Sequence, residues 1–511
     1  MVKMKNSEKE KGKDLPKDHF LYKILNPESI AVFGANNNLL TTMGSMQLRN
    51  IREGGFEGDI YPIHPRLEEV QGFKAYKNIL DTPKVPDLAF IILPPKIVPE
   101  VMEECGEKGV KRLIITSGGF REIGEDGVEL AETVNNIAQK YGMRFVGPNC
   151  LGIYNGWYQP EVKDSHFNTM WIYETPERGN ISIASQSGTI ACHIFWHCQD
   201  WGVKVGKSLS IGNELNIDII DYLEYFKDDP ETQVIGLYIE EIKRGREFVR
   251  VAKEITPDKP IVAIYAGGSE AAERSIKSHT GAIGGNQNIY DAVFKETGII
   301  STTSITEFLY YLRTLSFAQK ENIFMKGDKV GIITDSGGSG SMMTKAVENL
   351  GLTIPEFSDE LQAEISEKIP YTASPLNPID VTFDTNFVNL FKTFPKILME
   401  SGEIDAILVY GVFDFDDVLE TMEESGMEID DEMRQIGMMI ERAVFKPIKR
   451  LMKKYSLPVF YVGPMPYRFE WYQKFIRHNF PVFDFWDAPS KCLKILCDYS
   501  RYKRKVKKQL D

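Results

Sequence analysis

The chain of 511 residues is poor in cysteine and has no long apolar run. Its six cysteines are irregularly spaced, whereas a secreted disulfide framework would be denser, so we expect a reducing, cytoplasmic setting. Because no run of about eighteen apolar residues occurs, no transmembrane helix and no membrane partner are expected. The charged first residues lack the apolar core of a secretory signal, which also favours the cytoplasm.

Basic residues are also fewer than acidic ones. Against 73 Asp and Glu there are 60 Lys and Arg, which gives a net charge of −13. Nucleic-acid-binding proteins are usually basic, so no nucleic-acid partner is expected. The basic clusters at 3–13 and 501–508 are typical of solvated tails. Low-complexity segments and a repeat period are both missing, and the length predicts about three ordinary domains.

Strand-like apolar runs alternate with helix-length segments, which predicts an α/β protein with parallel sheets. The first block has the pattern of a Rossmann-like domain of ordinary size. Its strands are predicted at 29–35, 60–63, 88–93, 112–116 and 144–149, and its helices at 96–108 and 127–141.

Two further blocks follow the same pattern, separated by a polar linker near 320–328. One long helix, rich in Met, Arg and Lys, is predicted over 430–455 as an excursion from the third sheet. The strands of these blocks are predicted at 179–184, 207–211, 234–239, 260–265, 329–334, 406–410, 457–462 and 481–485.

Three motifs suggest sites that their context does not support. The segment 202–208 is one residue short of a nucleotide P-loop and leads into a strand instead of following one. His193 and His197 are one helical turn apart but have no evident third ligand, so a packed helix is favoured and no metal site is predicted. The segment 335–338 is interpreted as a Gly-rich turn at the head of a helix, not as a serine-protease signature.

One group of turns is predicted to bind a nucleotide-like ligand. Gly34, Ala35 and Asn36, with Gly44 downstream, form a β-to-α turn at the end of the first strand, where ligands bind in such sheets. The segments 92–95 and 115–119 end later strands of the same sheet and are expected to line the same crevice. An ordinary turn is the alternative for each segment taken alone.

A second set of turns and loops is predicted to bind a phosphoryl group. The segment 185–189 lies between a strand and a helix, where backbone N–H groups, hydroxyls and the helix dipole attract an anion. Gly212 and Asn213 form another such turn, before a helix predicted at 218–226. His279 lies in the small-residue loop 278–285, where an imidazole can act as a nucleophile and carry a group; a structural histidine is the alternative.

Together these segments resemble the α subunit of the NDP-forming acyl-CoA synthetases, especially ADP-forming acetyl-CoA synthetase, with the succinyl-CoA synthetase α subunit as a more distant relative. The resemblance extends from about Leu21 to Ala318 and continues more loosely beyond. It is carried by the segments 29–35, 60–65, 104–109, 146–152, 185–188, 236–240, 278–282, 334–338 and 377–380.

The resemblance implies an N-terminal Rossmann-like CoA-binding domain followed by two flavodoxin-like domains of the succinyl-CoA synthetase type. The boundaries are a polar leader at 1–20, the CoA-binding domain at 21–152, a ligase domain at 153–322, and a second such domain at 323–511 with an excursion at 412–455. The implied CoA-binding residues are Gly34, Ala35, Asn36, Gly44, Ile92, Pro94, Thr116, Ser117 and Gly118. The turn at 36–44 lacks the Pro and Lys that are common in this family.

The resemblance also implies a mechanism. His279 would become phosphohistidine, with Glu240 (or, one residue on, Glu241) holding the imidazole. The implied phosphate-binding residues are Ser185, Ser187, Gly188, Thr189, Gly212, Asn213 and Gly281.

The implied activity interconverts acyl-CoA, ADP and phosphate with a carboxylic acid, CoA and ATP, through an acyl phosphate and phosphohistidine. CoA is then a substrate, and ATP or ADP with Mg²⁺ is bound mainly by a separate ATP-grasp β subunit in an α2β2 assembly. The alternatives are a CoA-binding sensor or scaffold without catalysis, and a related ligase that acts on succinate, malate or citrate.

Overall fold

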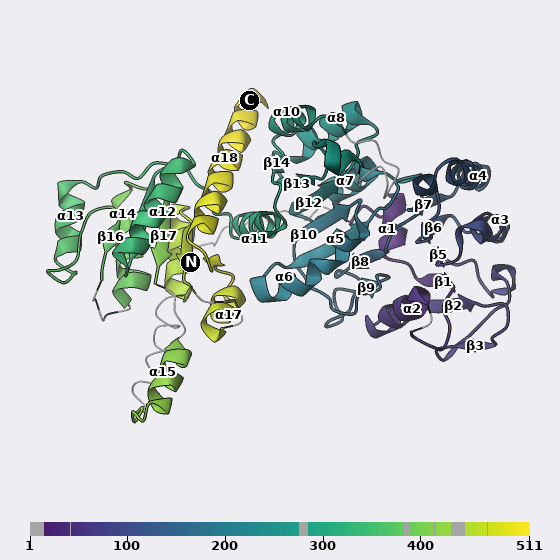
Figure 1. The fold of residues 1–511 in the computed structure, drawn as a ribbon, viewed down its shortest axis with the longest axis horizontal. Coiled ribbons are helices and arrows are strands. Elements are labelled where there is room, and N and C mark those ends of the chain that lie inside the picture. The colour runs from purple at the N-terminus through teal and green to yellow at the C-terminus, as the bar shows by residue number, and fades with distance from the viewer. Residues whose placement is uncertain are drawn as a thin grey trace, which may run out of the picture. The chain divides into compact units, whose positions relative to one another are not determined.

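The computed structural model describes residues 15–510 apart from 41, 275–284, 383, 385, 387, 412–414, 431–444, 465 and 468. The chain divides into two compact units, one made of 1–195 with 205–301 and the other of 196–204 with 302–511 (Figure 1). Among the described residues, no helix is both long and apolar enough to cross a membrane.

The first unit begins with a parallel five-stranded sheet in the order β2-β1-β5-β6-β7. All five residues of β1 are buried, as expected for a strand that helices cover on both faces. The strands are β1 (Ser29–Phe33), β2 (Asp59–Ile63), β5 (Leu88–Ile91), β6 (Arg112–Ile115) and β7 (Arg144–Val146), with a small hairpin of β3 (Glu69–Val70) and β4 (Phe73–Lys74).

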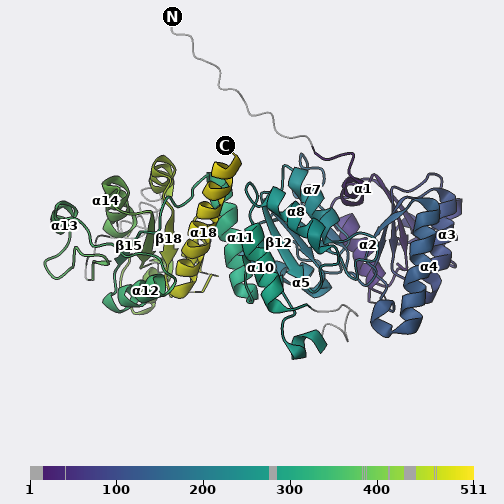
Figure 2. The same ribbon diagram turned by 90° about the horizontal axis from the view of Figure 1, so that it is seen from above.

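Successive β1 side chains face opposite layers of this sheet. Ala31 and Phe33 pack in one cluster with residues of α3 and α4, whereas Ile30 and Val32 pack in another with residues of α2. Figure 2 shows α3 and α4 lying together away from α2. The helices are α1 (Phe20–Leu25), α2 (Met43–Glu53), α3 (Val98–Lys108) and α4 (Glu125–Tyr141), with one-turn 3-10 helices at Ile79–Asp81, Pro95–Ile97 and Arg121–Ile123.

The second sheet of this unit has seven strands in the order β14-β13-β12-β10-β11-β8-β9. β10 to β14 are parallel, while β8 pairs antiparallel with both β11 and β9. The strands are β8 (Ile153–Asn155), β9 (Phe167–Asn168), β10 (Ile181–Ser185), β11 (Val205–Ser210), β12 (Val234–Ile239), β13 (Ile261–Tyr265) and β14 (Ile300–Ser301), and the helices are α5 (Gly188–His193), α7 (Ile219–Asp228), α8 (Gly245–Ile255) and α10 (Gln287–Thr297).

The segment that resembles a P-loop, 202–208, leads into β11, which begins at Val205. Lys207 is 1% exposed there, and its ammonium lies 2.8 Å from Asp229 and 2.6 Å from Glu231. A phosphate-binding lysine would be free to reach a ligand, so the structure agrees with the prediction that this segment leads into a strand and is not a P-loop.

The second unit contains a parallel five-stranded sheet in the order β16-β15-β17-β18-β19. The turn at 335–338 leads into α12, as predicted. Of the helix expected over 430–455, residues 445–455 are helical and 431–444 lie outside the described residues. The strands are β15 (Val330–Thr334), β16 (Ile379–Asp380), β17 (Ala406–Tyr410), β18 (Val459–Val462) and β19 (Val482–Phe483), and the helices are α6 (Phe195–Trp201), α11 (Ile305–Glu321), α12 (Gly337–Asn349), α13 (Asp359–Ser366), η4 (Asn389–Thr393), α14 (Phe394–Ser401), α15 (Phe415–Glu424), α17 (Glu470–Arg477) and α18 (Asp487–Leu510).

Candidate functional site

The first candidate site lies where β1 and β5 end side by side. Gly34 follows β1 with φ of +86°, and a Cβ atom there would lie 2.0 Å from the carbonyl oxygen of Ile92, which follows β5. Only glycine fits this approach. Because α2 begins at Met43 on one side of the sheet and α3 packs on the other, the crevice is at the switch point where such sheets bind ligands.

Hydrogen bonds connect the two ends of the turn between Gly34 and Gly44. The Asn36 N–H donates to the Ser45 hydroxyl at 3.0 Å, and the Thr42 hydroxyl donates to the Gly34 carbonyl at 2.8 Å. Thr42 also caps α2, and Ala35 and Gly44 are buried. These contacts join the end of β1 to the start of α2.

The other predicted CoA-binding residues lie at the same edge of the sheet. The Ile92 N–H donates to the carbonyl of Phe33, the last residue of β1, and the Thr116 N–H donates to that of Ile91 at the end of β5. The Ser117 hydroxyl donates to the Leu93 carbonyl at 2.6 Å. Pro94 and Gly118 are exposed beside them. The structure thus brings all nine predicted residues to the ends of three neighbouring strands.

The second candidate site is a small polar cavity in the same unit. Two predicted phosphate-binding residues, Gly212 and Asn213, line it together with Glu240. From the turn at 185–189, only Gln186 lines it among the described residues, and Gln186 was not predicted as a site residue. The remaining lining residues are Arg121, Glu214, Glu241 and Lys243.

The turn at Gly212 is forced close to the first domain. Its φ is +59°, and a Cβ atom there would lie 2.2 Å from the Pro148 carbonyl oxygen. The Asn213 side chain donates to the Glu122 carboxylate at 2.7 Å and accepts from the Asn149 amide at 3.2 Å. Its N–H donates to Pro148. Asn213 therefore ties the turn to the loops that follow β6 and β7, and its side chain is fully engaged.

The segment at 185–189 forms the start of α5. The Ser187 hydroxyl accepts from the Ile190 N–H and caps this helix, while the Ser185 hydroxyl donates to the Ser187 carbonyl at 2.7 Å. Gly188 leaves room for Leu151, which a Cβ atom would approach to 2.6 Å. Thr189 is exposed. An ordinary N-cap therefore accounts for Ser187, and the phosphate role of these four residues stays a prediction.

Glu240 directly follows β12 and is 5% exposed. Its N–H donates to the Gln186 side-chain oxygen, and so does the N–H of Glu241, at 3.0 Å. Gln186 thus holds the main chain at the point where both candidate carboxylates begin. These two hydrogen bonds do not show which of the carboxylates, Glu240 or Glu241, would support the imidazole.

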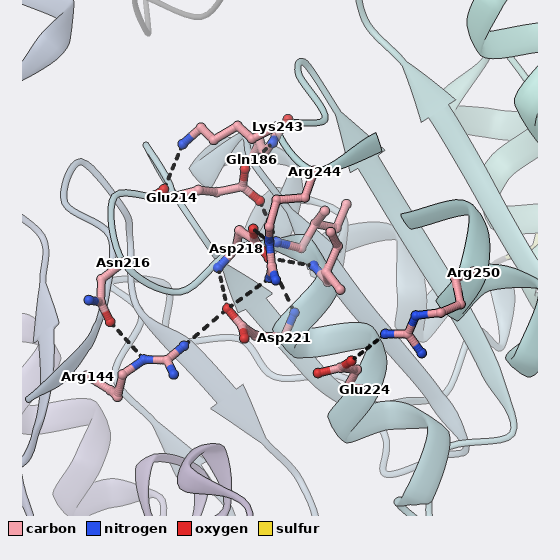
Figure 3. Close-up of polar contacts among 12 residues, drawn as sticks. Arg144, Gln186, Glu214, Asn216, Asp218, Asp221, Glu224, Lys243, Arg244 and Arg250 are labelled. Carbon is pink, nitrogen blue, oxygen red and sulfur yellow. Dashed lines mark hydrogen bonds and ion pairs between the residues drawn. The ribbon is translucent and has the colours of Figure 1, made fainter. Parts of the chain in front are cut away.

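Glu214, which the sequence analysis did not identify, is the most deeply buried carboxylate beside the cavity (Figure 3). One of its oxygens accepts from the Ile219 N–H at 2.7 Å and the other from the Gln186 amide at 2.8 Å. Lys243 donates to the Asn213 and Glu214 carbonyls at 2.8 and 2.6 Å. Burial raises the pKa of Glu214 to about 7, against the opposing charge of Lys243.

Charged side chains brace α7 beside this cavity (Figure 3). Asp218 caps the helix and lies 2.6 Å from Arg244, while Arg144 on β7 lies 3.2 Å from Asp221. Hydrogen bonding to Arg244 lowers the pKa of Asp218 despite its burial. Arg144 therefore connects the first sheet to the helix that precedes β12.

His279 and Gly281 lie outside the described residues, so their predicted roles are not placed. The next described residue, Gly285, exchanges hydrogen bonds with the Tyr265 hydroxyl at 2.6 and 2.7 Å. Tyr265 stacks on Tyr290, whose hydroxyl accepts from the Ile242 N–H at 3.2 Å. Tyr265 and Tyr290 thus link Gly285, where the described chain resumes, to the main chain of Ile242, two residues after Glu240.

Among the residues that the structure describes, no group of three or more His, Cys, Asp or Glu side chains could hold a metal ion. The segment of His193 and His197 runs from α5 into α6. The His193 ring packs edge-on against Trp171, 5.8 Å between centroids. His193 is half-buried and His197 is exposed, so only the first of the two lies in packed surroundings.

Two known domain families match this chain. A CoA binding domain matches residues 28–156, and a succinyl-CoA ligase like flavodoxin domain matches residues 178–315.

Curated relatives cover most of the chain. The α subunit of ADP-forming acetate–CoA ligase II of Pyrococcus furiosus is 34% identical over 442 residues, which are 85% of this chain and 93% of that protein. The α subunit of the corresponding ligase I is 38% identical over 367 residues, 70% of this chain and 76% of that protein.

A solved structure agrees with these relatives. Acetyl-coenzyme A synthetase 1 of Ca. Korarchaeum cryptofilum, in complex with phosphate and ADP, matches with a TM-score of 0.80 and 29% identity over 96% of this chain and 99% of that chain. The predicted fold class, of a CoA-binding Rossmann-like domain followed by succinyl-CoA-synthetase-type domains, is confirmed. The chain belongs to the family of ADP-forming acyl-CoA synthetase α subunits.

Proposed function

We propose that this chain is the α subunit of an ADP-forming acyl-CoA synthetase and carries both the CoA site and the histidine that transfers the phosphoryl group. The observation that supports this most strongly is the joining of two sites in one unit. The crevice at Gly34 and the cavity at Glu240 are connected through Asn213, which bonds to Glu122 and Asn149 of the CoA-binding domain.

In the first step, CoA would lie in the crevice between the ends of β1, β5 and β6. The turn from Gly34 to Gly44 and the N-terminus of α2 are suited to an anionic pyrophosphate. Ile92, Pro94, Thr116, Ser117 and Gly118 would line the remaining wall. Phosphate attacks the thioester carbonyl, and the thiolate leaves as CoA while an acyl phosphate forms.

In the second step, a neutral imidazole nitrogen of His279 attacks the phosphorus atom. The acid leaves as a carboxylate, and the bond to nitrogen gives phosphohistidine. Glu240 would balance the positive charge that develops on the ring. The turns at 185–189 and 212–213, with Gly281, would stabilise the phosphoryl oxygens. The phosphoryl group then passes to an oxygen of ADP, and every step is reversible.

We assign ADP, ATP and Mg²⁺ mainly to an ATP-grasp β subunit, in an α2β2 assembly in the cytoplasm. The support is that relatives covering most of this chain are named as α subunits. A small carboxylic acid, with acetate as the working substrate, follows from the same names.

The test is phosphorylation of the purified complex with labelled ATP and Mg²⁺. The chain is expected to take up label that is stable in base and labile in acid, and His279→Ala is expected to abolish it. His193→Ala is the matched control and is expected to keep the label. Equal labelling of His279→Ala would refute the assignment, and CoA binding without any labelling would favour the sensor or scaffold.

A further inference from the structure

Gln186 is held in one orientation by its neighbours. Its side-chain oxygen accepts from the N–H groups of Glu240 and Glu241, and its NH₂ group donates to the Glu241 carbonyl and to the Glu214 carboxylate, each at 2.8 Å. The two ends of an amide are not interchangeable, because one only accepts and the other only donates. The direction of Gln186 is therefore set by Glu214 on one side and by the end of β12 on the other.

As a carboxylate, Glu214 accepts a hydrogen bond from a neighbour at each of its two oxygens. One oxygen is occupied by the Ile219 N–H and the other by the Gln186 NH₂, and the residue is 4% exposed. The charged groups that act on it are Lys243 and Asp218, at the cap of α7. Lys243 favours the ionised form and Asp218 opposes it.

We propose that Glu214 is a positioning residue for phosphoryl transfer: its carboxylate fixes the Gln186 amide, which holds the main chain of Glu240 and Glu241, the two candidates for the supporting carboxylate. The role of that carboxylate rests on the proposed function. In this proposal Glu214 acts through Gln186, to which its carboxylate is hydrogen-bonded at 2.8 Å.

Replacing one carboxylate oxygen of Glu214 by an NH₂ group tests the order of donors and acceptors in these contacts. In Glu214→Gln, the amide oxygen keeps the contact with the Ile219 N–H only if the new NH₂ group faces the NH₂ group of Gln186. If Gln186 turns over to relieve this, its own NH₂ group faces the N–H groups of Glu240 and Glu241. Either arrangement leaves buried donors facing one another, which is costly.

The reciprocal exchange restores the order of donors and acceptors in three of the four contacts of position 186. In the double variant Glu214→Gln with Gln186→Glu, the amide at position 214 donates to the carboxylate at position 186. That carboxylate also accepts from the N–H groups of Glu240 and Glu241, but its second oxygen replaces the donor to the Glu241 carbonyl with an acceptor, so this one contact becomes unfavourable. Glu224→Gln is the matched control, since Glu224 also lies on this side of the unit but forms an exposed pair with Arg250 at 3.3 Å (Figure 3).

The rate of labelling is measured in the complex with an ATP-grasp β subunit, from two directions. Labelling from acetyl-CoA and labelled phosphate uses the centre at Glu240, whereas labelling from ATP uses the nucleotide site of the β subunit. We expect Glu214→Gln to slow the first at least about tenfold and to leave the second within about threefold. The double variant is expected to recover part of the first rate, because three of the four contacts of position 186 are restored.

Hydrogen–deuterium exchange of the peptide that contains Glu240 and Glu241 is measured on the same samples. We expect faster exchange in Glu214→Gln, partial recovery in the double variant, and no change in Glu224→Gln. Equal loss in both labelling directions, or no recovery in the double variant, would overturn the proposal. If wild type takes up no label, the proposed function fails, while the exchange data still decide whether Glu214 positions this strand end.

Discussion

The close approach at Gly34 predicts a specific loss of CoA binding. In Gly34→Ala, the new methyl group would lie 2.0 Å from the Ile92 carbonyl oxygen, whereas Cβ atoms stay at least 3.0 Å from other atoms. The ends of β1 and β5 must therefore separate by about 1 Å at the crevice. The φ of +86° adds roughly 1–2 kcal/mol of backbone strain.

Gly142→Ala separates these two effects. Gly142 ends α4 with φ of +61°, and a Cβ atom there meets nothing within 4 Å, so this variant carries the strain without the clash. Isothermal titration with CoA is expected to show a Kd at least about tenfold weaker for Gly34→Ala, equal to about 1.4 kcal/mol, and an unchanged Kd for Gly142→Ala. Wild-type affinity in a folded Gly34→Ala would refute the placement of CoA at this turn.

Three further predictions follow from buried or competing charges. Lys207→Met should destabilise the first unit by about 3–5 kcal/mol in urea unfolding, because Asp229 is left buried and unpaired; Lys227→Met, which breaks an exposed pair with Glu254, should cost under about 1 kcal/mol, and equal losses would contradict the reasoning. The raised pKa of Glu214 means that its contribution to stability is present below about pH 4.5 and lost as pH rises through about 7. Between about pH 4.5 and about pH 7, the free energy of unfolding should therefore fall more in wild type than in Glu214→Gln, by on the order of 3 kcal/mol. Parallel plots of unfolding free energy against pH for the two proteins would contradict this prediction. Glu240→Gln should slow phosphohistidine formation by several kcal/mol of barrier, and a larger loss in Glu241→Gln would move the role by one residue.

The long apolar strands could be predicted from the sequence because burial on both faces leaves a continuous hydrophobic run. β12 and β17 lie at the predicted residues, 234–239 and 406–410. The short antiparallel strands β8 and β9 were missed, since two or three residues such as Phe167 and Asn168 carry no period. β8 pairs with β11, which is distant in the sequence, and β9 pairs only with β8 among the described strands.

The candidate site was only partly visible in the sequence. Small-residue turns such as Gly212–Asn213 can be recognised because few other residues fit there. Gln186 and Glu214 carry no such signal, because their roles arise from contacts across 28 residues of sequence. Their proximity to predicted turns, directly after Ser185 and Asn213, is the one local hint. The engagement of the Asn213 side chain by Glu122 likewise depends on packing between two domains.

The central claim is that this chain couples release of CoA to phosphorylation of His279. The most direct measurement is a single turnover of the complex with acetyl-CoA and labelled phosphate in the absence of ADP, with free thiol and protein-bound label counted together. The account predicts one CoA released for each phosphoryl group found on His279, with no label in His279→Ala. Label on another residue, or release of CoA in wild type without a matching phosphohistidine, would contradict it.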